Sequence, residues 1–141
     1  MRPDLELTLP ARAENIAIVR HAFGALGETW GIHEQTLSDV RLAVTEACTN
    51  VVVHAYPDGE EGPLEVRAAC VERQLTVAVR DRGRGIVPRH DSPGLGLGLP
   101  LIASLAESVQ LGHGDERHTE VLMTFALDGH PARAPVPPEP S

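Results

Sequence analysis

Three polar side chains recur at a spacing of four residues in one stretch of the chain. They are Glu46, Asn50 and His54, an acid, an amide and an imidazole. Residues four apart on an α-helix lie on the same face, so these side chains can reach the same small volume. Side chains of these types bind ligands and exchange protons. The alternative is an ordinary solvated helix face, since polar residues mostly lie outside.

A carboxylate and two glycines follow a predicted strand, in the order Asp81, Gly83 and Gly85. Glycine lets the backbone approach a flat ligand closely, while the carboxylate accepts a hydrogen bond. A turn that begins with Asp is the alternative interpretation.

A second glycine cluster, GLGLGLP, spans residues 94–100 and leads into a predicted helix with Pro100 in its first turn. The amides of Gly96, Gly98 and Leu99 would then be free to face an anion, helped by the helix dipole. Leu99 stands where a dinucleotide-binding fingerprint needs its third glycine, so that motif is excluded. A purely structural loop remains possible.

Helices and strands must position the residues that could do chemistry, and the periodicity of apolar residues predicts where those elements lie. The longest run without Gly or Pro, residues 34–55, carries an apolar stripe at helical spacing and is predicted to be one helix. A helix is also expected over residues 11–28 and another from Pro100 to Glu107. Strands are expected over residues 5–9, 64–71, 75–80, 109–111 and 119–127, with residues 72–74 closing a hairpin. This order predicts an α+β fold, a two-layer sandwich in which helices cover one face of a mainly antiparallel sheet.

The composition of the chain argues against several classes of partner and site. The chain has 141 residues and a net charge of −8, which argues against nucleic acid or an anionic membrane surface as the main partner. All 12 basic residues are arginine, so a P-loop lysine and a Schiff-base lysine are excluded. Cys48 and Cys70 lie far apart, and the seven histidines form no zinc motif.

The ends of the chain carry no targeting signal that we recognise. No apolar segment follows Met1, and no run approaches the length of a membrane span, so we expect a cytoplasmic protein. Residues 128–141 are proline-rich and are expected to form a disordered tail after a single domain over residues 1–127.

Taken together, the ordered motifs are more specific than any one of them. TEACTNVVVHAY, DRGRGI and GLGLGLPLI resemble the anti-sigma-factor serine kinases of bacteria (RsbW/SpoIIAB type), within the GHKL superfamily of ATP-binding domains. The resemblance covers roughly residues 5–127, and the helix motif ending in His-Ala-Tyr is its most specific part.

The resemblance implies a role for each matching position. Asn50 would coordinate Mg²⁺ on the phosphates of ATP, and Glu46 would orient or deprotonate the attacking hydroxyl. Asp81 would accept a hydrogen bond from the adenine amino group, assisted by Thr119. The remaining implied nucleotide-binding residues are His54, Gly83, Gly85, Gly94, Gly96, Gly98 and Leu99.

The resemblance also implies an activity and partners. The chain would be an ATP-dependent protein serine/threonine kinase that binds a sigma factor and phosphorylates an anti-anti-sigma protein with a STAS-type fold. It would form a homodimer and present the first helix, with Arg12, Glu14 and Arg20, to partners.

Two departures from the family pattern stand out: His118 occupies the usual glycine position before Thr119, and the loop between the glycine clusters is short. Two alternatives remain, a nucleotide-binding module that sequesters a partner without phosphotransfer and an interaction domain with an empty pocket.

Overall fold

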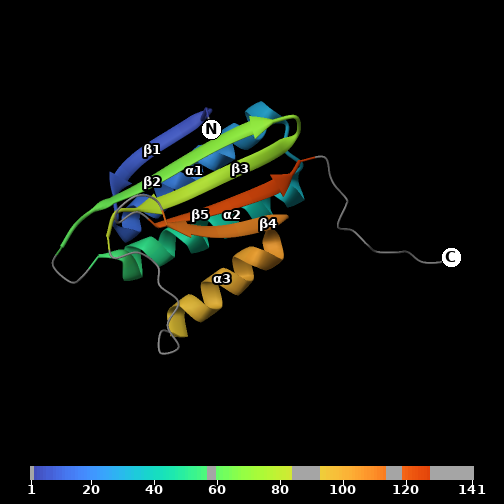
Figure 1. Cartoon of the computed structure of the whole chain (residues 1–141). Helices are drawn as coiled ribbons and strands as arrows, with labels where there is room; N and C mark the ends of the chain where they lie inside the picture. The colour runs from blue at the N-terminus through green and yellow to red at the C-terminus, as the bar shows by residue number, and fades with distance from the viewer. Residues whose placement is uncertain (1, 57–59, 84–92, 114–118, 128–141) are drawn as a thin grey trace.

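The structure is a computed structural model that describes residues 2–56, 60–83, 93–113 and 119–127. Figure 1 shows the order of the elements along the chain. They are β1 (Leu5–Pro10), α1 (Ala13–Trp30), α2 (Glu34–Asn50), a short π-helix η1 (Val51–Ala55), β2 (Pro63–Val71), β3 (Gln74–Asp81), α3 (Pro93–Leu105), β4 (Ser108–His113) and β5 (Thr119–Ala126). The predicted order of strands and helices is confirmed.

The strands form one sheet in the order β1-β2-β3-β5-β4, and every neighbouring pair is antiparallel. The hairpin between β2 and β3 turns through Glu72 and Arg73, whose φ angles are 53° and 63°. Positive φ at both central residues is the geometry of a two-residue turn that matches the twist of the flanking strands. The connection is therefore one residue shorter than the predicted 72–74.

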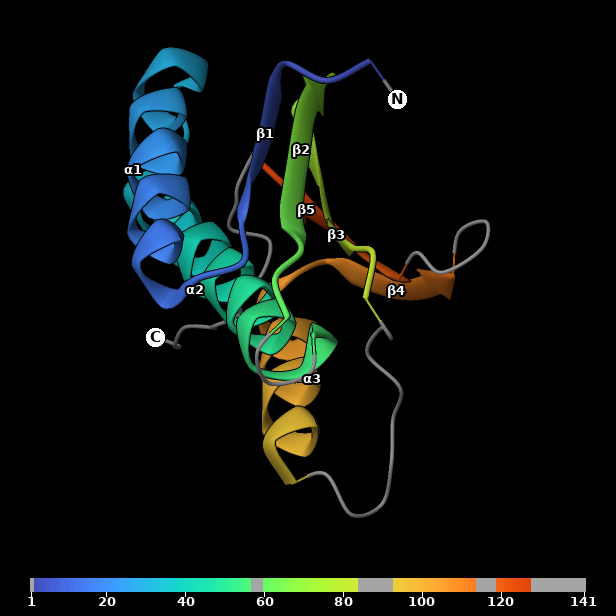
Figure 2. The ribbon, with the colours of Figure 1, turned by 90° about the vertical axis from the view of Figure 1, so that its left-hand side faces the viewer.

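One face of the sheet is covered by helices, as predicted. Figure 2 shows α1 and α2 in a layer against the sheet, with α3 below them. Because side chains alternate along a strand, every second residue points into the space between the layers. Those of the three central strands are fully or almost fully buried: Leu64, Val66, Ala68, Leu75, Val77, Val79, Val121, Met123 and Phe125.

The opposite face of the sheet carries ion pairs between neighbouring strands. Arg67 lies 3.1 Å from Glu6, and Arg80 lies 2.9 Å from Glu120. Both are cross-strand partners in the sheet register, the arrangement in which opposite charges stabilise a sheet. This face carries charged side chains beside the buried Ala69 and Ala78. Helices cover only the other face, which confirms the predicted α+β sandwich.

The helical run 34–55 is confirmed, but its last turn differs from an α-helix. Val40, Val44, Ala47, Val51 and Ala55 of the predicted stripe are buried. From Val51 the turn widens into the π-helix η1. The angular position of His54 relative to Asn50 therefore departs from the α-helical spacing that the sequence suggested.

The third helix begins earlier than predicted. Helix α3 starts at Pro93, and Pro100 lies inside it rather than in its first turn. Proline fits the first position of a helix, and Pro93 provides that signal equally well. Ile102 is fully buried, and Leu99 and Leu105 pack against the core, so tertiary packing offsets the low helix propensity of the glycines.

No helix within the described ranges is long and apolar enough to cross a bilayer. The predicted tail, residues 128–141, lies outside the described part of the chain.

Candidate functional site

Asp81 and Thr119 come together at the end of the sheet. Asp81 is the last residue of β3 and Thr119 the first of β5, and the two are direct partners in the antiparallel register. Both continue the alternation of buried, helix-facing positions in their strands. Asp81 is 1% exposed and Thr119 is 3% exposed. The sequence paired these two residues, and the structure brings them to the same place.

The turn after Asp81 explains the first glycine of the Asp-x-Gly motif. The backbone N–H of Gly83 donates to Oδ1 of Asp81 at 3.0 Å. A β-carbon at Gly83 would collide with the carbonyl of Ala55 and would lie 2.7 Å from Cδ1 of Tyr56. Glycine is required here because the turn packs directly against the end of η1.

Asn50 is the last residue of α2, directly before η1, and it lies against α3. The Asn50 residue is 4% exposed, and its Nδ2 atom has no hydrogen-bond partner among the described residues. A β-carbon at Gly98 would lie 2.9 Å from that nitrogen and 3.1 Å from Oδ1. Gly98 therefore leaves room for the Asn50 amide. A buried amide oxygen suits Mg²⁺, which takes one or two protein oxygens and completes its shell with phosphates and water.

Two close approaches thus mark opposite ends of one helical segment. Gly83 lies against Ala55, and Gly98 lies against Asn50. Ala55 lies five positions after Asn50, which would correspond to about 7.5 Å of rise in an α-helix. The half-buried Glu46 lies one turn before Asn50, and the half-buried His54 lies in η1. The Asp81 turn and α3 therefore both pack against the short helical segment that carries Asn50 and His54.

The family comparison fits this geometry. A sequence model for the histidine kinase-like ATPase domain matches residues 9–125. The chain belongs to that family. It is 34% identical over 135 residues to the serine-protein kinases RsbW of Bacillus thuringiensis (strain Al Hakam) and Bacillus cereus (strain AH820), covering 85% of this chain and 82% of each relative. The predicted resemblance to RsbW-type members of the GHKL superfamily is confirmed.

Solved structures support the fold of this ATPase domain. The RsbU and RsbW domains of Rv1364c from Mycobacterium tuberculosis match with a TM-score of 0.71 at 24% identity, over 90% of this chain and 33% of that one. The histidine kinase domain of a blue-light activated kinase from Erythrobacter litoralis EL346 matches with a TM-score of 0.57 at 23% identity, over 84% of this chain and 62% of that one. These matches show the shared fold.

The second glycine cluster of the ATPase domain lies within α3 rather than in a loop before it. Gly94, Gly96, Gly98 and Leu99 are all helical residues. Only the first four N–H groups of a helix lack a partner in the helix, so the expectation of free amides fits Gly96 but not Gly98 or Leu99. Gly98 instead contributes space for Asn50, and Leu99 packs against the core.

Some predicted residues take other positions or lie outside the described ranges. Gly85 and His118 belong to segments that the structure does not describe. Arg82, between Asp81 and Gly83, donates from Nε to Oε2 of Glu65 at 2.8 Å. Glu65 is 8% exposed and lies on the face of the sheet opposite the helices.

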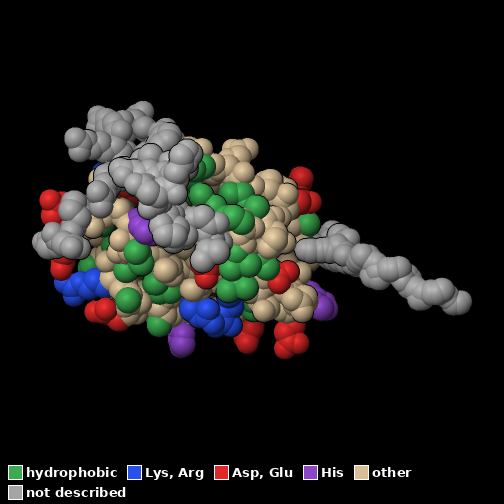
Figure 3. Space-filling model, turned by 90° about the horizontal axis from the view of Figure 1, so that it is seen from below, with side chains coloured by type: hydrophobic (Ala, Val, Ile, Leu, Met, Phe, Trp, Pro, Cys, Tyr) green, Lys and Arg blue, Asp and Glu red, His purple; other side chains and the backbone are tan. Residues whose placement is uncertain are grey.

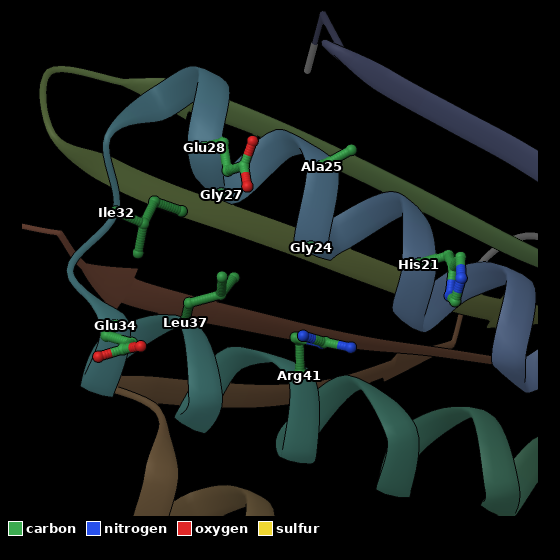
Figure 4. A pocket seen from close by; sticks show the side chains of 9 residues that line it. All are labelled: His21, Gly24, Ala25, Gly27, Glu28, Ile32, Glu34, Leu37 and Arg41. Carbon is green, nitrogen blue, oxygen red and sulfur yellow. The ribbon is translucent and has the colours of Figure 1, made fainter.

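A hollow between α1 and α2 is separate from the predicted site of the ATPase domain. Its volume is about 630 Å³, and Figure 4 shows the nine residues that line it. Charged or titratable groups at its edges are His21, Glu28, Glu34 and Arg41. Among the predicted nucleotide-binding residues that the structure describes, none lines it, so it is not the candidate ATP site.

The sequence alone did not predict that Tyr56 contributes to this site. It was noted only as the end of a recognisable motif, yet it contacts both Gly62 and Gly83. A usable signal was present: Tyr56 is the only tyrosine of a chain that is poor in aromatics, and it directly follows the polar helical segment.

Proposed function

We propose that the chain is an ATP-dependent protein serine/threonine kinase of the anti-sigma type, with residues 1–127 as its catalytic domain and residues 128–141 as a tail. The observation that carries the proposal is the buried pair of Asp81 and Thr119 beside a turn that only glycine fits. Burial of a carboxylate is costly unless hydrogen bonds compensate, which suits a group that receives a ligand's N–H. The similarity to RsbW supports the choice of phosphotransfer as the reaction.

The nucleotide would lie along residues 50–55, which contact Gly98 at one end and Gly83 at the other. Its adenine amino group would donate to Asp81, with Thr119 beside it. His54, Gly83 and Gly85 would flank the nucleoside. The phosphates would reach Asn50 and the first turn of α3, where Gly94 and Gly96 offer amides at the positive end of the helix dipole.

Phosphotransfer needs an oriented acceptor hydroxyl and neutralised charge more than covalent help from the protein. Glu46, one helical turn from Asn50, would accept the proton of the acceptor serine or threonine. That oxygen would form the new bond to the γ-phosphorus as the bond to ADP breaks. Mg²⁺, held by Asn50, would offset the charge of the phosphates.

The proposed partners are a sigma factor and a STAS-type anti-anti-sigma protein, met in the cytoplasm by a homodimer of this chain. Ile18 on α1 and Leu42 on α2 are exposed aliphatic residues of the helical layer. Nearby polar groups include Arg20, which donates to Oγ1 of Thr45 at 3.1 Å, and Arg12, which pairs with Glu61. Figure 3 shows hydrophobic side chains among charged ones on the face seen from below, a composition that suits protein contacts.

Calorimetric titration of ATP with Mg²⁺ into the purified chain tests nucleotide binding. We expect micromolar affinity, about −8 kcal/mol. Asp81→Asn should abolish it, because the amide presents an N–H to the adenine amino group in place of an acceptor. Gly112→Ala serves as control, since a β-carbon there meets no atom within 4 Å. Equal affinity for wild type and Asp81→Asn would contradict the proposal.

The Glu46→Ala variant separates the kinase from a module that binds nucleotide and sequesters a partner without turnover. Transfer of ³²P from ATP to a cognate STAS-domain protein should fall by about 10²–10⁴-fold, with ATP affinity retained. Unchanged transfer would remove Glu46 from the mechanism. Absence of transfer in the wild type, together with tight ATP binding, would favour the sequestering module.

A further inference from the structure

Tyr56 joins three segments that are distant in the sequence. It directly follows η1 with extended backbone angles, φ −121° and ψ 135°. Its hydroxyl donates to the carbonyl oxygen of Pro63 at 2.5 Å and accepts from the backbone N–H of Arg82 at 2.9 Å. Pro63 begins β2, and Arg82 is the first residue after β3. One hydroxyl therefore ties the end of the helical segment to two strands of the sheet.

Two glycines lie close to one edge of the Tyr56 ring. A β-carbon at Gly62 would collide with ring atoms Cε1 and Cζ, and one at Gly83 would lie 2.7 Å from Cδ1. The backbone of two segments thus approaches the ring closely, and both segments reach its Cδ1 atom. Because the contacts are this close, a change in the ring position would move the turn that contains Gly83.

The same turn sets the direction of the Asp81 carboxylate. Tyr56 accepts from the N–H of Arg82, and the next N–H, that of Gly83, donates to Oδ1 of Asp81 at 3.0 Å. The Arg82 side chain anchors the turn from the other face of the sheet through its hydrogen bond to Glu65. Two successive N–H groups are therefore held, one by Tyr56 and one by the carboxylate itself.

We propose that Tyr56 is a positioning residue for base recognition, whose hydroxyl holds the Arg82–Gly83 backbone so that Asp81 points at the exocyclic amino group of the nucleotide. The inference rests on the proposed function, in which Asp81 accepts from that amino group. Burial raises the pKa of Tyr56, which keeps the hydroxyl protonated and able both to donate and to accept.

The Tyr56→Phe variant tests the inference through base specificity. We would measure the affinities of Mg²⁺-ADP and Mg²⁺-inosine diphosphate by calorimetry, because inosine carries a carbonyl where adenine has its amino group. Wild type should prefer ADP by about tenfold or more, since a wrong base leaves Asp81 without its donor. Loss of the Tyr56 hydroxyl should reduce this preference by about threefold or more, mainly through weaker ADP binding.

A merely structural role for Tyr56 predicts a different result. Loss of the hydroxyl would then weaken the binding of both nucleotides equally and leave the ratio of their affinities unchanged. That result would overturn the inference. Ser108→Ala is the control, because it too removes a hydrogen-bonding hydroxyl. The Ser108 hydroxyl lies 2.6 Å from Oγ1 of Thr124 and joins strands β4 and β5. It should leave the ratio unchanged. If wild type binds neither nucleotide, the proposed function itself fails, whereas a preserved ratio in Tyr56→Phe contradicts only the positioning role.

A second measurement keeps the inference testable if Tyr56→Phe folds poorly. Tyr56 is the only tyrosine, so growth on 3-fluorotyrosine places a single ¹⁹F label on its ring without replacing the residue. Titration with Mg²⁺-ADP should shift this resonance with the same dissociation constant that calorimetry gives, and inosine diphosphate should shift it less. An unmoved resonance during ADP binding would contradict the coupling between Tyr56 and Asp81.

Discussion

At the scale of single residues, the absence of a side chain at Gly98 determines where the Asn50 amide can lie. A β-carbon at that position would come within 2.9 Å of Nδ2 and 3.1 Å of Oδ1. Asn50 belongs to a buried helix end and cannot move away into solvent. In the proposed kinase, the position of this amide would set how the Mg²⁺-bound phosphates are held.

The Gly98→Ala variant should therefore weaken binding of ADP by about tenfold when Mg²⁺ is present, or about 1.4 kcal/mol. The loss should be smaller in EDTA, where the amide has no cation to bind. Titrations with and without Mg²⁺ would measure both values. Gly112→Ala, with no atom near the added carbon, should match wild type under both conditions. Equal losses with and without Mg²⁺ would indicate that Asn50 does not act through the cation.

At the scale of elements, glycines on α1 allow it to approach α2. A β-carbon at Gly27 would lie 2.6 Å from Cδ2 of Leu37, whereas one at Gly24 would lie 3.6 Å from Nη1 of Arg41. The first distance demands that Leu37 shift, and the second is an ordinary contact. Two glycines only three residues apart on the same helix thus differ in what they contribute to packing.

These two positions give opposite predictions for stability. Gly24→Ala should raise the free energy of unfolding by up to about 1 kcal/mol, because alanine has the higher helix propensity. Gly27→Ala should lower it by about 1–3 kcal/mol through overpacking against Leu37. Urea denaturation followed by circular dichroism would measure both. A Gly27→Ala variant as stable as Gly24→Ala would show that the interface adapts without strain.

At the scale of the whole molecule, the aliphatic core between the sheet and the helices controls the ionisation of Cys48. The residue is fully buried on α2, and burial raises the pKa of its thiol from an ordinary 9.0 to about 12. The folded state therefore retains a proton that the unfolded state releases above about pH 9. Stability from this group is complete below pH 9 and is lost as the pH rises toward 12.

Wild type should accordingly lose up to about 1.4 kcal/mol of unfolding free energy per pH unit in that range through Cys48. Cys48→Ala should show a flatter dependence when urea midpoints at pH 8 and pH 10 are compared. Cys70→Ala serves as control, because Cys70 is only partly buried and should leave most of the slope in place. Identical slopes for wild type and Cys48→Ala would refute the assignment.

Local pattern was sufficient for the class of fold and for most of the candidate site. Apolar spacing predicted the order of strands and helices, and the helical run 34–55 appears over its full length. The motifs also pointed to Asp81 and Asn50, and the family resemblance added Thr119; the structure buries all three at the ends of their elements. Periodicity and turn residues are properties of neighbouring positions, so the sequence by itself determined these features.

Tertiary structure decided the features that depend on segments far apart in the chain. The start of α3 at Pro93 depends on its packing against the core, which overrides the low helix propensity of its glycines. The contacts of Gly83 with Ala55, of Gly98 with Asn50 and of Tyr56 with Arg82 likewise join distant segments. No local spacing encodes such an approach, because strand register and helix packing are set only when the layers close around a shared core.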